Sequence, residues 1–325
     1  MRIVITGGAG FIGSHLVDRL LKARVGEIIV LDNFAKGTTD NLRFLTGEVT
    51  VFQSDICHAP LDRILRNVDL VYHLAGVTNV RTAMADPAAC LSNNVSGTVN
   101  VLHAAYRVGV RHIVLASSRE VYGDAQSLPV CEDAPLNPKN VYGASKVAAE
   151  YCCMGSAVPK TIVRIANVYG TRDCGRVVPM FIENALADRP LMIFGGDQIV
   201  DFIKVECVAE ALLRAGLGPP QNGPVNIGSG HGITIEALAR RIVELTRSRS
   251  RLHFLPQNAA EVTRFVANTS RASLSLGLPA IADPLDGLPE VIEFIREKRA
   301  ARMRAEFLSF SPEAAPQADS PARHD

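Results

Sequence analysis

Short, continuous apolar runs alternate with amphipathic segments along the first half of the chain. Such runs are typical of strands in a parallel sheet that is covered on both faces, whereas a half-exposed strand would alternate apolar and polar residues. They predict strands at residues 2–6, 27–31, 49–53, 69–74, 112–117 and 160–165. Apolar residues at helical spacing predict intervening helices at residues 11–23, 92–108 and 141–154.

The regular order of strand and helix predicts both the fold class and the place of a ligand site. Alternation at this rhythm indicates an α/β fold with a doubly wound parallel sheet of the Rossmann type. Right-handed crossovers then bring the carboxyl ends of all the strands to one edge, where ligands bind. We therefore expect functional side chains at the strand ends and in the turns that follow them.

The pattern loosens after about residue 170. Helices are predicted in 176–188 and 234–245, and a strand with a turn in 223–230. This half should form a smaller, mixed α/β domain that caps the strand edge. The expected organisation is a first domain over 1–170, rejoined by segments near 200–230, a capping domain mainly over 171–308, and a disordered tail rich in Pro, Ala and Ser over 309–325.

Composition and charge narrow the choice of partners. The chain has 325 residues, of which 47% are hydrophobic and 21% charged, and its net charge is +1. That balance gives no basis for binding nucleic acid or an anionic membrane surface. The N-terminus lacks the features of a signal peptide and no run of 18 apolar residues occurs, so we expect a cytoplasmic protein without a membrane span.

The seven cysteines are scattered and do not have the Cys/His spacing of a zinc site, so no metal is expected. Their odd number in a chain of this size favours reduced thiols, as in the cytosol.

A glycine-rich turn, "ITGGAGFIGSHL", follows the first strand and opens the first helix. Gly7, Gly10 and Gly13 permit a tight turn, a close approach of the backbone to a pyrophosphate, and packing of the helix on the strand. The helix N-terminus supplies free N–H groups to the phosphates. A glycine-rich turn without a ligand is the alternative. A P-loop NTPase is excluded, because Ser14 follows Gly13 where that motif needs Lys.

The strands after this turn support dinucleotide binding and favour NAD. Asp32 ends the second strand, about 20 residues beyond the glycine motif, where a carboxylate binds both ribose hydroxyls and repels a 2′-phosphate. Lys36 is not in the adjacent position that would bind such a phosphate most directly. Asp55, after the third strand, is expected either to meet the adenine edge or to be a simple turn residue. The small residues of "HLAG" at 73–76 would let the dinucleotide lie close.

Tyr142 and Lys146 are four residues apart on a predicted helix, which puts them on one face. A phenol has a pKa near 10, and a neighbouring ammonium favours the phenolate. With Ser118 hydrogen-bonded to the substrate oxygen, such a trio removes a proton from an alcohol during oxidation by a nicotinamide. The alternative is a surface Tyr and Lys that only stabilise a helix.

Six stretches together resemble the extended short-chain dehydrogenase/reductase family: "GGAGFIG", "HLAG", "NNVSGTVNV", "SSREVYG", "YGASK" and "VRIANVYG". Within it they resemble the NAD-dependent nucleotide-sugar epimerases and dehydratases, of the UDP-glucose 4-epimerase type. The resemblance implies that Tyr142 is the base, that Lys146 anchors the ribose and that Ser118 orients the sugar. It also places Asn94 near the cofactor and Asn167 near the substrate.

The resemblance further implies a nucleotide-sugar substrate and a homodimer formed through helices 92–108 and 141–154. The expected cofactor contacts are Gly7, Gly10, Phe11, Ile12, Gly13, Asp32, Asn33, Asp55, Ile56, Leu74, Ala75, Asn94, Tyr142 and Lys146. The expected substrate contacts are Ser118, Arg119, Asn167, Arg172 and Arg264.

The stretch "SSREVYG" bears on the reaction type. Glu120 resembles the Ser/Thr-x-Glu of dehydratases and UDP-glucuronate decarboxylases, in which a carboxylate can act as a second base. Dehydratases of the glucose type pair that Glu with a preceding Asp, and this chain has Arg119 instead. Arg119 is expected either to bind a carboxylate on the substrate, as on a uronic acid, or to form a local salt bridge.

The second half departs from the family pattern. Val200 replaces an Arg and Cys207 an Asp, and two usual diphosphate-binding arginines are missing. Arg172, Arg176 and Arg264 are possible substitutes, and the motif around Arg264 places it best.

The leading hypothesis is an NAD-dependent epimerase of a nucleotide-activated sugar that acts through transient oxidation at carbon 4. Dehydration or uronate decarboxylation with Glu120 as second base is the alternative. A net dehydrogenase or reductase of a non-nucleotide compound would explain the lost arginines. A non-catalytic NAD-binding scaffold is disfavoured, because Tyr142 and Lys146 are both present.

Overall fold

The fold is built on a parallel sheet of seven strands in the order β11-β6-β5-β4-β1-β2-β3. The computed structural model describes residues 1–42, 48–256 and 262–309, with side chains up to residue 305. The strands of the large sheet are β1 (Arg2–Thr6), β2 (Glu27–Asp32), β3 (Val49–Gln53), β4 (Leu70–His73), β5 (His112–Ser118), β6 (Lys160–Ile165) and β11 (Pro224–Ile227). All the pairings in this sheet are parallel. The predicted α/β Rossmann fold is therefore confirmed.

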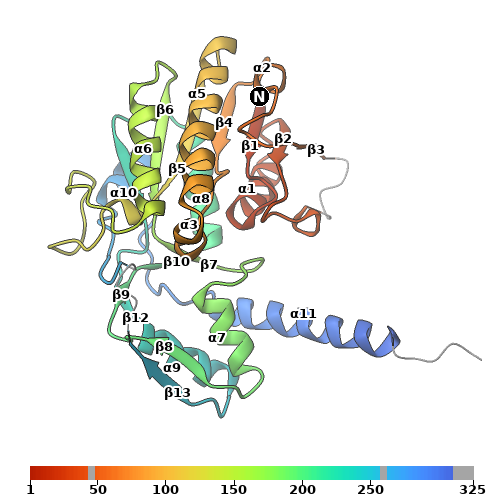
Figure 1. Cartoon of the computed structure of the whole chain (residues 1–325), viewed down its shortest axis with the longest axis vertical. Helices are drawn as coiled ribbons and strands as arrows, with labels where there is room; N and C mark the ends of the chain where they lie inside the picture. Colours follow the sequence, from red (N-terminus) through yellow and green to blue (C-terminus); the bar gives the residue numbers. More distant parts are fainter. Residues whose placement is uncertain (43–47, 257–261, 310–325) are drawn as a thin grey trace, which may run out of the picture.

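Helices cover both faces of this sheet (Figure 1). They include α1 (Phe11–Lys22), α2 (Leu61–Ile64), α5 (Gly97–Val108), α6 (Val141–Gly155) and α8 (Val205–Leu217). Because side chains alternate along a strand, Ile3 and Ile5 of β1 join the core formed with α1 and α8, whereas Val4 joins the core formed with α2, α5 and α6. All three are fully buried, which explains why the strand reads as a continuous apolar run.

One predicted strand is less buried than its sequence suggests. β3 lies at the edge of the sheet, and Val51 and Phe52 are 43% and 41% exposed. An edge strand has a neighbour on one side only, so apolar residues there are not enclosed as they are in β1 or β4.

The remaining elements surround a separate apolar core, which contains Tyr169, Phe181, Ile193, Leu238 and Ile292 among its buried residues. These elements include β7 (Asn167–Tyr169), α7 (Val177–Ala185), β8 (Leu191–Phe194), β9 (Ile199–Val200), β10 (Phe202–Lys204), β12 (Ile233–Thr234), α9 (Ile235–Thr246), β13 (Leu252–Leu255) and α11 (Leu288–Ser309). By contrast, α10 (Ser270–Leu276) joins the core of the large sheet through Ala272 and Leu276. Figure 1 shows α7, α9, β8 and β13 grouped below the large sheet. The chain returns to the large sheet through α8 and β11, while the domain boundary near residue 170 remains a prediction.

The predicted helix 92–108 is the C-terminal part of a longer helical run. This run consists of α4 (Pro87–Leu91), a π-helical segment over Ser92–Ser96 and then α5. π-helical segments occur often at functional sites. Two further short helical elements, α3 (Val80–Ala85) and a 3₁₀ turn over Arg119–Val121, precede and follow this run.

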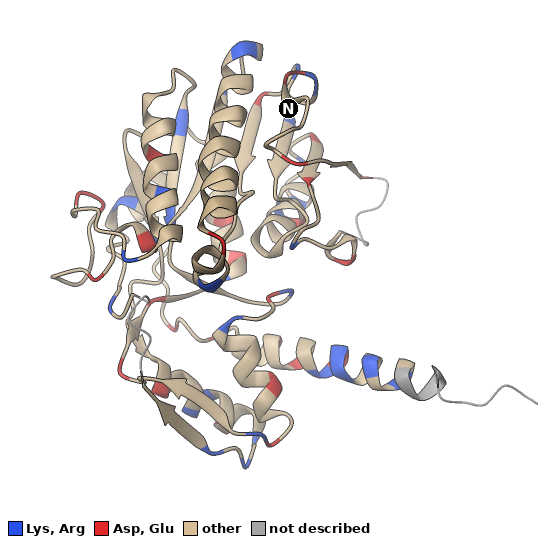
Figure 2. Cartoon of the chain, in the orientation of Figure 1, with Lys and Arg blue, Asp and Glu red and all other residues tan. Residues whose placement is uncertain are grey.

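The distal part of α11 extends away from the body, and Figure 2 shows several basic residues along it. The expected disordered tail falls almost wholly on residues 310–325, which lie outside the described residues. Over the described ranges, no helix has both the length and the apolar character needed to cross a membrane. In the same ranges, no group of three or more His, Cys, Asp or Glu side chains is arranged to hold a metal ion.

Candidate active site

The glycine turn between β1 and α1 is packed so closely that side chains would not fit. A Cβ on Gly13 would lie 2.2 Å from the Gly7 carbonyl oxygen, and one on Gly7 would lie 2.7 Å from the amide nitrogen of Ala75. Gly7 also has φ +72°, which favours glycine. Gly10 precedes α1 without a side-chain cap, so N–H groups at the start of the helix are free for a phosphate. Phe11 and Ile12, in the first turn of α1, are partly exposed beside this cradle.

The expected ribose-binding and adenine-binding residues lie together beside the glycine turn. Asp32 ends β2, and its carboxylate accepts hydrogen bonds from the backbone N–H of Ala9 at 2.9 Å and of Phe34 at 2.8 Å. These bonds tie the glycine turn to the end of β2. Asn33 donates to the Asp55 carboxylate at 2.7 Å, which links the ends of β2 and β3. Of the other expected cofactor residues, Ile56 is buried, and Leu74 and Ala75 are partly exposed after β4.

Tyr142 and Lys146 lie on the same buried face of α6, as their spacing predicts. Burial raises the pKa of Tyr142, and a hydrogen bond with Ser118 opposes that shift. Lys146 donates to the carbonyl oxygen of Ala116 in β5 at 3.0 Å. Burial lowers the pKa of Lys146 to about 8, so this amine is much less basic than a surface lysine.

The sequence predicted an effect of the Lys146 ammonium on the phenol of Tyr142, and the structure adds the charges of three further residues. The positive charges of Arg176 and Arg119 lower the pKa of its phenol, and the negative charge of Glu120 raises it. The guanidinium of Arg176 also lies 5.4 Å from the centre of the Phe11 ring. Two guanidinium groups therefore contribute to a positive potential around the phenol.

Asn94, in the π-helical segment, is bonded to the turn after β4 and to α6. Its side-chain oxygen accepts from the backbone N–H of Val77 at 2.7 Å, and its amide donates to the Val77 carbonyl at 3.0 Å and to the Ser145 hydroxyl at 2.8 Å. A Cβ on Gly76 would lie 2.9 Å from the Asn94 side-chain oxygen and 3.4 Å from Lys146 Nζ. Asn94 thus fixes the position of the backbone next to Lys146.

The stretch after β5 forms a buried turn that contains a local salt bridge, one of the two alternatives expected for Arg119. Ser118 Oγ accepts a hydrogen bond from the backbone N–H of Glu120 at 3.2 Å. Arg119 Nη2 lies 3.0 Å from Glu120 Oε1, and the two side chains are 12% and 8% exposed. The second carboxylate oxygen accepts from the side chain of Asn140 at 2.9 Å. Asn140 also caps α6 by accepting from the N–H of Gly143, so Glu120 is tied to the start of the catalytic helix.

The expected substrate residues of the second half are dispersed. Asn167 begins β7 with a buried side-chain oxygen that has no hydrogen-bond partner among the described residues, so it can accept a hydrogen bond from a ligand. Arg172 pairs with Asp18 of α1 at 2.7 Å, and Arg264 is exposed beside β9. The expected role of Arg172 and Arg264 in binding the substrate stays a prediction.

Several residues with contacts at this site were not predicted from the sequence. Asn140 had a recognisable signal, because an Asn directly before a helical pattern is a common N-cap. Asp173 had none: burial raises the pKa of its carboxyl to about 6, and that burial depends on packing between distant segments.

Comparison with known proteins identifies the family. The model of the NAD dependent epimerase/dehydratase family matches residues 3–228. The chain belongs to this family. It is 33% identical to UDP-glucuronic acid decarboxylase 1 of Danio rerio over 337 residues, covering 100% of this chain and 79% of that protein. It is 34% identical to UDP-glucose 4-epimerase of Mycolicibacterium smegmatis, covering 92% and 99% respectively.

A solved structure of similar fold is UDP-glucuronic acid 4-epimerase from Bacillus cereus in complex with UDP-glucuronic acid and NAD. It has a TM-score of 0.87 and 29% sequence identity, and the match covers 92% of this chain and 100% of that one. As a member of the epimerase/dehydratase family, the protein is an NAD-dependent enzyme acting on nucleotide sugars. The tight glycine cradle and the free N-terminus of α1 fit the pyrophosphate of NAD.

Proposed function

We propose that the protein is a 4-epimerase of a nucleotide-linked uronic acid. The observation that carries this proposal is the buried Arg119–Glu120 pair beside Tyr142. A guanidinium in this place, with Arg176 nearby, favours a substrate with a carboxylate close to the reacting carbon. The similar Bacillus cereus structure contains UDP-glucuronic acid and is consistent with such a substrate.

Side chains of the protein would accept and return the proton of the sugar hydroxyl. When bound, NAD supplies the oxidising and reducing power at carbon 4 of the sugar. Tyr142, as phenolate, accepts the proton of the carbon-4 hydroxyl during oxidation and returns it when the keto sugar is reduced on the opposite face. Ser118 is bonded to the phenol and would hydrogen-bond the same sugar oxygen. Lys146 would hold the ribose of the cofactor near the phenol.

Dehydration is less well supported, because the Glu120 carboxylate is already bound by Arg119 and Asn140. This pairing favours the epimerase over a reaction that needs Glu120 to remove a second proton.

Decarboxylation is the second candidate, because curated UDP-glucuronic acid decarboxylases match the chain at 33–35% identity over at least 91% of its length. A uronic acid oxidised at carbon 4 is a β-keto acid, which can lose carbon dioxide without a second base. The two candidates therefore share the residues of the oxidation step and differ in the fate of the keto sugar.

Mass spectrometry of the full-length protein incubated with UDP-glucuronate distinguishes the candidates. A product of unchanged mass and altered retention supports epimerisation, whereas loss of carbon dioxide supports decarboxylation. Tyr142→Phe should abolish either reaction and leave NAD bound. UDP-, GDP- and dTDP-linked neutral sugars serve as comparison substrates, and turnover of these alone would contradict the uronate proposal.

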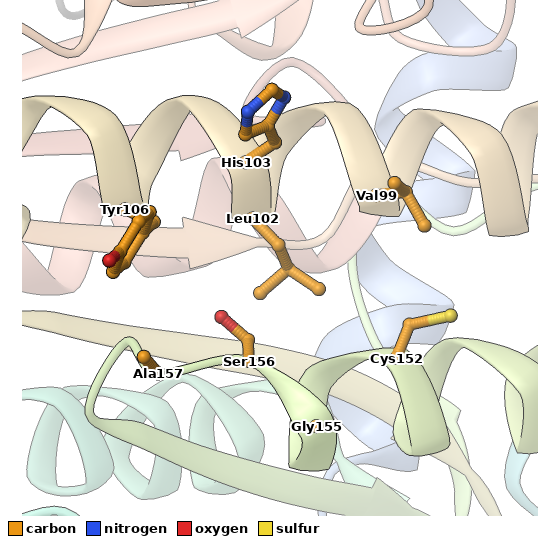
Figure 3. Close-up of a pocket in the computed structure, with 8 residues that line it drawn as sticks. All are labelled: Val99, Leu102, His103, Tyr106, Cys152, Gly155, Ser156 and Ala157. Carbon is orange, nitrogen blue, oxygen red and sulfur yellow. The ribbon is translucent and has the colours of Figure 1, made fainter.

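We further propose that the enzyme is a homodimer formed through α5 and α6. An open, mainly apolar groove runs between these helices (Figure 3), and Leu102 of α5 points across it toward Ser156. Val99 and Tyr106 at this groove are 43% and 62% exposed, and Tyr151 of α6 is 61% exposed. Exposed apolar side chains on two adjacent helices are typical of a protein–protein contact. A second copy fits this surface, since the family resemblance implies dimers formed by these helices.

A further inference from the structure

A buried ion pair lies on the α6 face that carries Tyr142 and Lys146. Glu150 of α6 is fully buried, and Arg164 of β6 has an exposed side-chain fraction of 4%. The guanidinium donates to both carboxylate oxygens, with Nη2 at 2.7 Å from Oε2 and Nε at 3.0 Å from Oε1. Because burying two charges offsets much of their attraction, such a pair is weak evidence for a role in stability alone.

The pair is connected to the turn that carries Ser118. Ser117, at the end of β5, donates a hydrogen bond to Oε1 of Glu150. Arg164 donates to the hydroxyl of Tyr122 at 2.8 Å, just beyond the Arg119–Val121 turn. The Glu150–Arg164 pair therefore contacts residues on both sides of the active-site turn and fixes it relative to α6.

Glu150 also lies one helical turn beyond Lys146, on the same face. The other groups facing Lys146 are the carbonyl of Ala116, the side chains of Asn94 and Cys90, and the buried ring of His73. Burial of the His73 ring and the nearby charge of Lys146 lower its pKa to about 3, so His73 is neutral near neutral pH. Interactions with Cys90 and with the carboxylate of Glu150 raise the pKa of Lys146 against the effect of burial.

We propose that Glu150 is a positioning residue, which fixes the reactive face of α6 against the end of β5. This proposal rests on the roles proposed above for Tyr142 and Lys146. Loss of the Glu150 charge should allow Lys146 to lose its proton at lower pH, and should let the phenol shift relative to Ser118.

Glu150→Gln tests the charge directly, because the amide keeps the shape of the side chain. The fraction of NAD that stays with the holoenzyme through gel filtration is measured between pH 6 and 10. The alkaline limit of retention, which is the pH above which NAD is lost, should move down by about one pH unit or more. With UDP-glucuronate, kcat should fall by about 10- to 100-fold and its alkaline limit should move the same way.

Tyr122→Phe is the matched control, because it removes a hydroxyl that joins Arg164 to Asn226 and leaves the Glu150–Arg164 pair in place. It should lower the melting temperature without moving either alkaline limit. If Glu150→Gln behaves like this control, with lower stability and unchanged limits, Glu150 is only structural and the proposal is overturned.

If Glu150→Gln does not fold, the double variant Glu150→Met/Arg164→Leu replaces the pair by apolar side chains, which often preserves stability. A folded double variant with a lower alkaline limit of NAD retention supports the proposal, and one that matches the wild type in retention and kcat overturns it. NAD retention needs no sugar substrate. A wild type that converts no nucleotide sugar would therefore defeat the proposed function, and the retention measurement would still decide the role of Glu150.

Discussion

Arg119 and Glu120, adjacent in sequence, form an ion pair of 3.0 Å in which both side chains are almost buried. A salt bridge on the surface contributes little, but this one lies beside the phenol of Tyr142, where Glu120 raises the pKa of the phenol and Arg119 lowers it. The pair therefore combines two features that are proposed to decide the reaction: a cation for an acidic sugar and a carboxylate that is not free to act as a base.

Replacement of Arg119 by Gln should selectively impair acidic substrates. Loss of a charge-assisted hydrogen bond is worth about 1.5–3 kcal/mol, so KM for UDP-glucuronate should rise roughly 10- to 100-fold. The ratio of kcat/KM for UDP-glucuronate to that for UDP-glucose is the measurement. Arg264→Gln, on an exposed side chain expected to bind the diphosphate that both substrates share, is the control and should affect both substrates alike. An unchanged ratio in Arg119→Gln would show that Arg119 does not contact the acid.

Asn140 should matter for both stability and catalysis. Asn140→Ala removes the cap on Gly143 and a donor to Glu120, and loss of such a cap costs about 1 kcal/mol of stability. Asn140→Asp keeps the cap but places a second carboxylate against Glu120, so it should retain more helix stability and still lose activity. Urea unfolding together with kcat measures the two effects. Equal kcat in all three proteins would show that the link from Glu120 to α6 has no catalytic importance.

Protonation of His73 should contribute to acid destabilisation. The ring lies between the hydroxyls of Thr6 and Thr98, at 2.7 and 2.9 Å, and burial together with the charge of Lys146 lowers its pKa from 6.5 to about 3. The unfolded chain therefore binds the proton first, so this contribution is complete above pH 6.5 and is lost as the pH falls toward 3. The expected loss is about 1.4 kcal/mol for each pH unit in that window.

His73→Gln tests this expectation, because the amide can still bond both hydroxyls and does not titrate. Urea unfolding between pH 4 and 8 should give a shallower acid slope for the variant than for the wild type. Identical slopes would assign the acid sensitivity to other groups.

The proposed dimer predicts that Tyr106→Glu yields a monomer, because it places a charge in the apolar groove between α5 and α6. Light scattering coupled to gel filtration gives the mass of each protein. Leu274→Glu is the control: Leu274 is 88% exposed on α10, outside the groove, and its variant should keep the wild-type mass. A wild-type monomer would exclude this proposal at once.

The strands of the large sheet could be predicted almost to the residue, because buried parallel strands are continuous apolar runs. The spacing of Tyr142 and Lys146 was equally informative, since helical geometry alone puts them on one face. In both cases the local sequence pattern is sufficient for the prediction, and the same is true of the glycine turn.

Long-range pairing could not be predicted in the same way. Nothing local indicates that Arg172 would pair with Asp18, that Asn94 would lie in a π-helical segment, or that Lys146 would bond to Ala116. Short strands such as β9 and β12, with two residues each, carry too few positions for any periodicity. These features depend on how distant segments pack. Because the second half departs from the family pattern, the resemblance could not supply that information either.

The helix α6, which carries the proposed base, has a buried side and an exposed side. Tyr142 and Lys146 face inward, while Tyr151 and Met154 face outward and are 61% and 42% exposed. Because both sides belong to one helix, a neighbouring molecule or a bulky substitution that displaced α6 from outside would also displace the phenol without touching it.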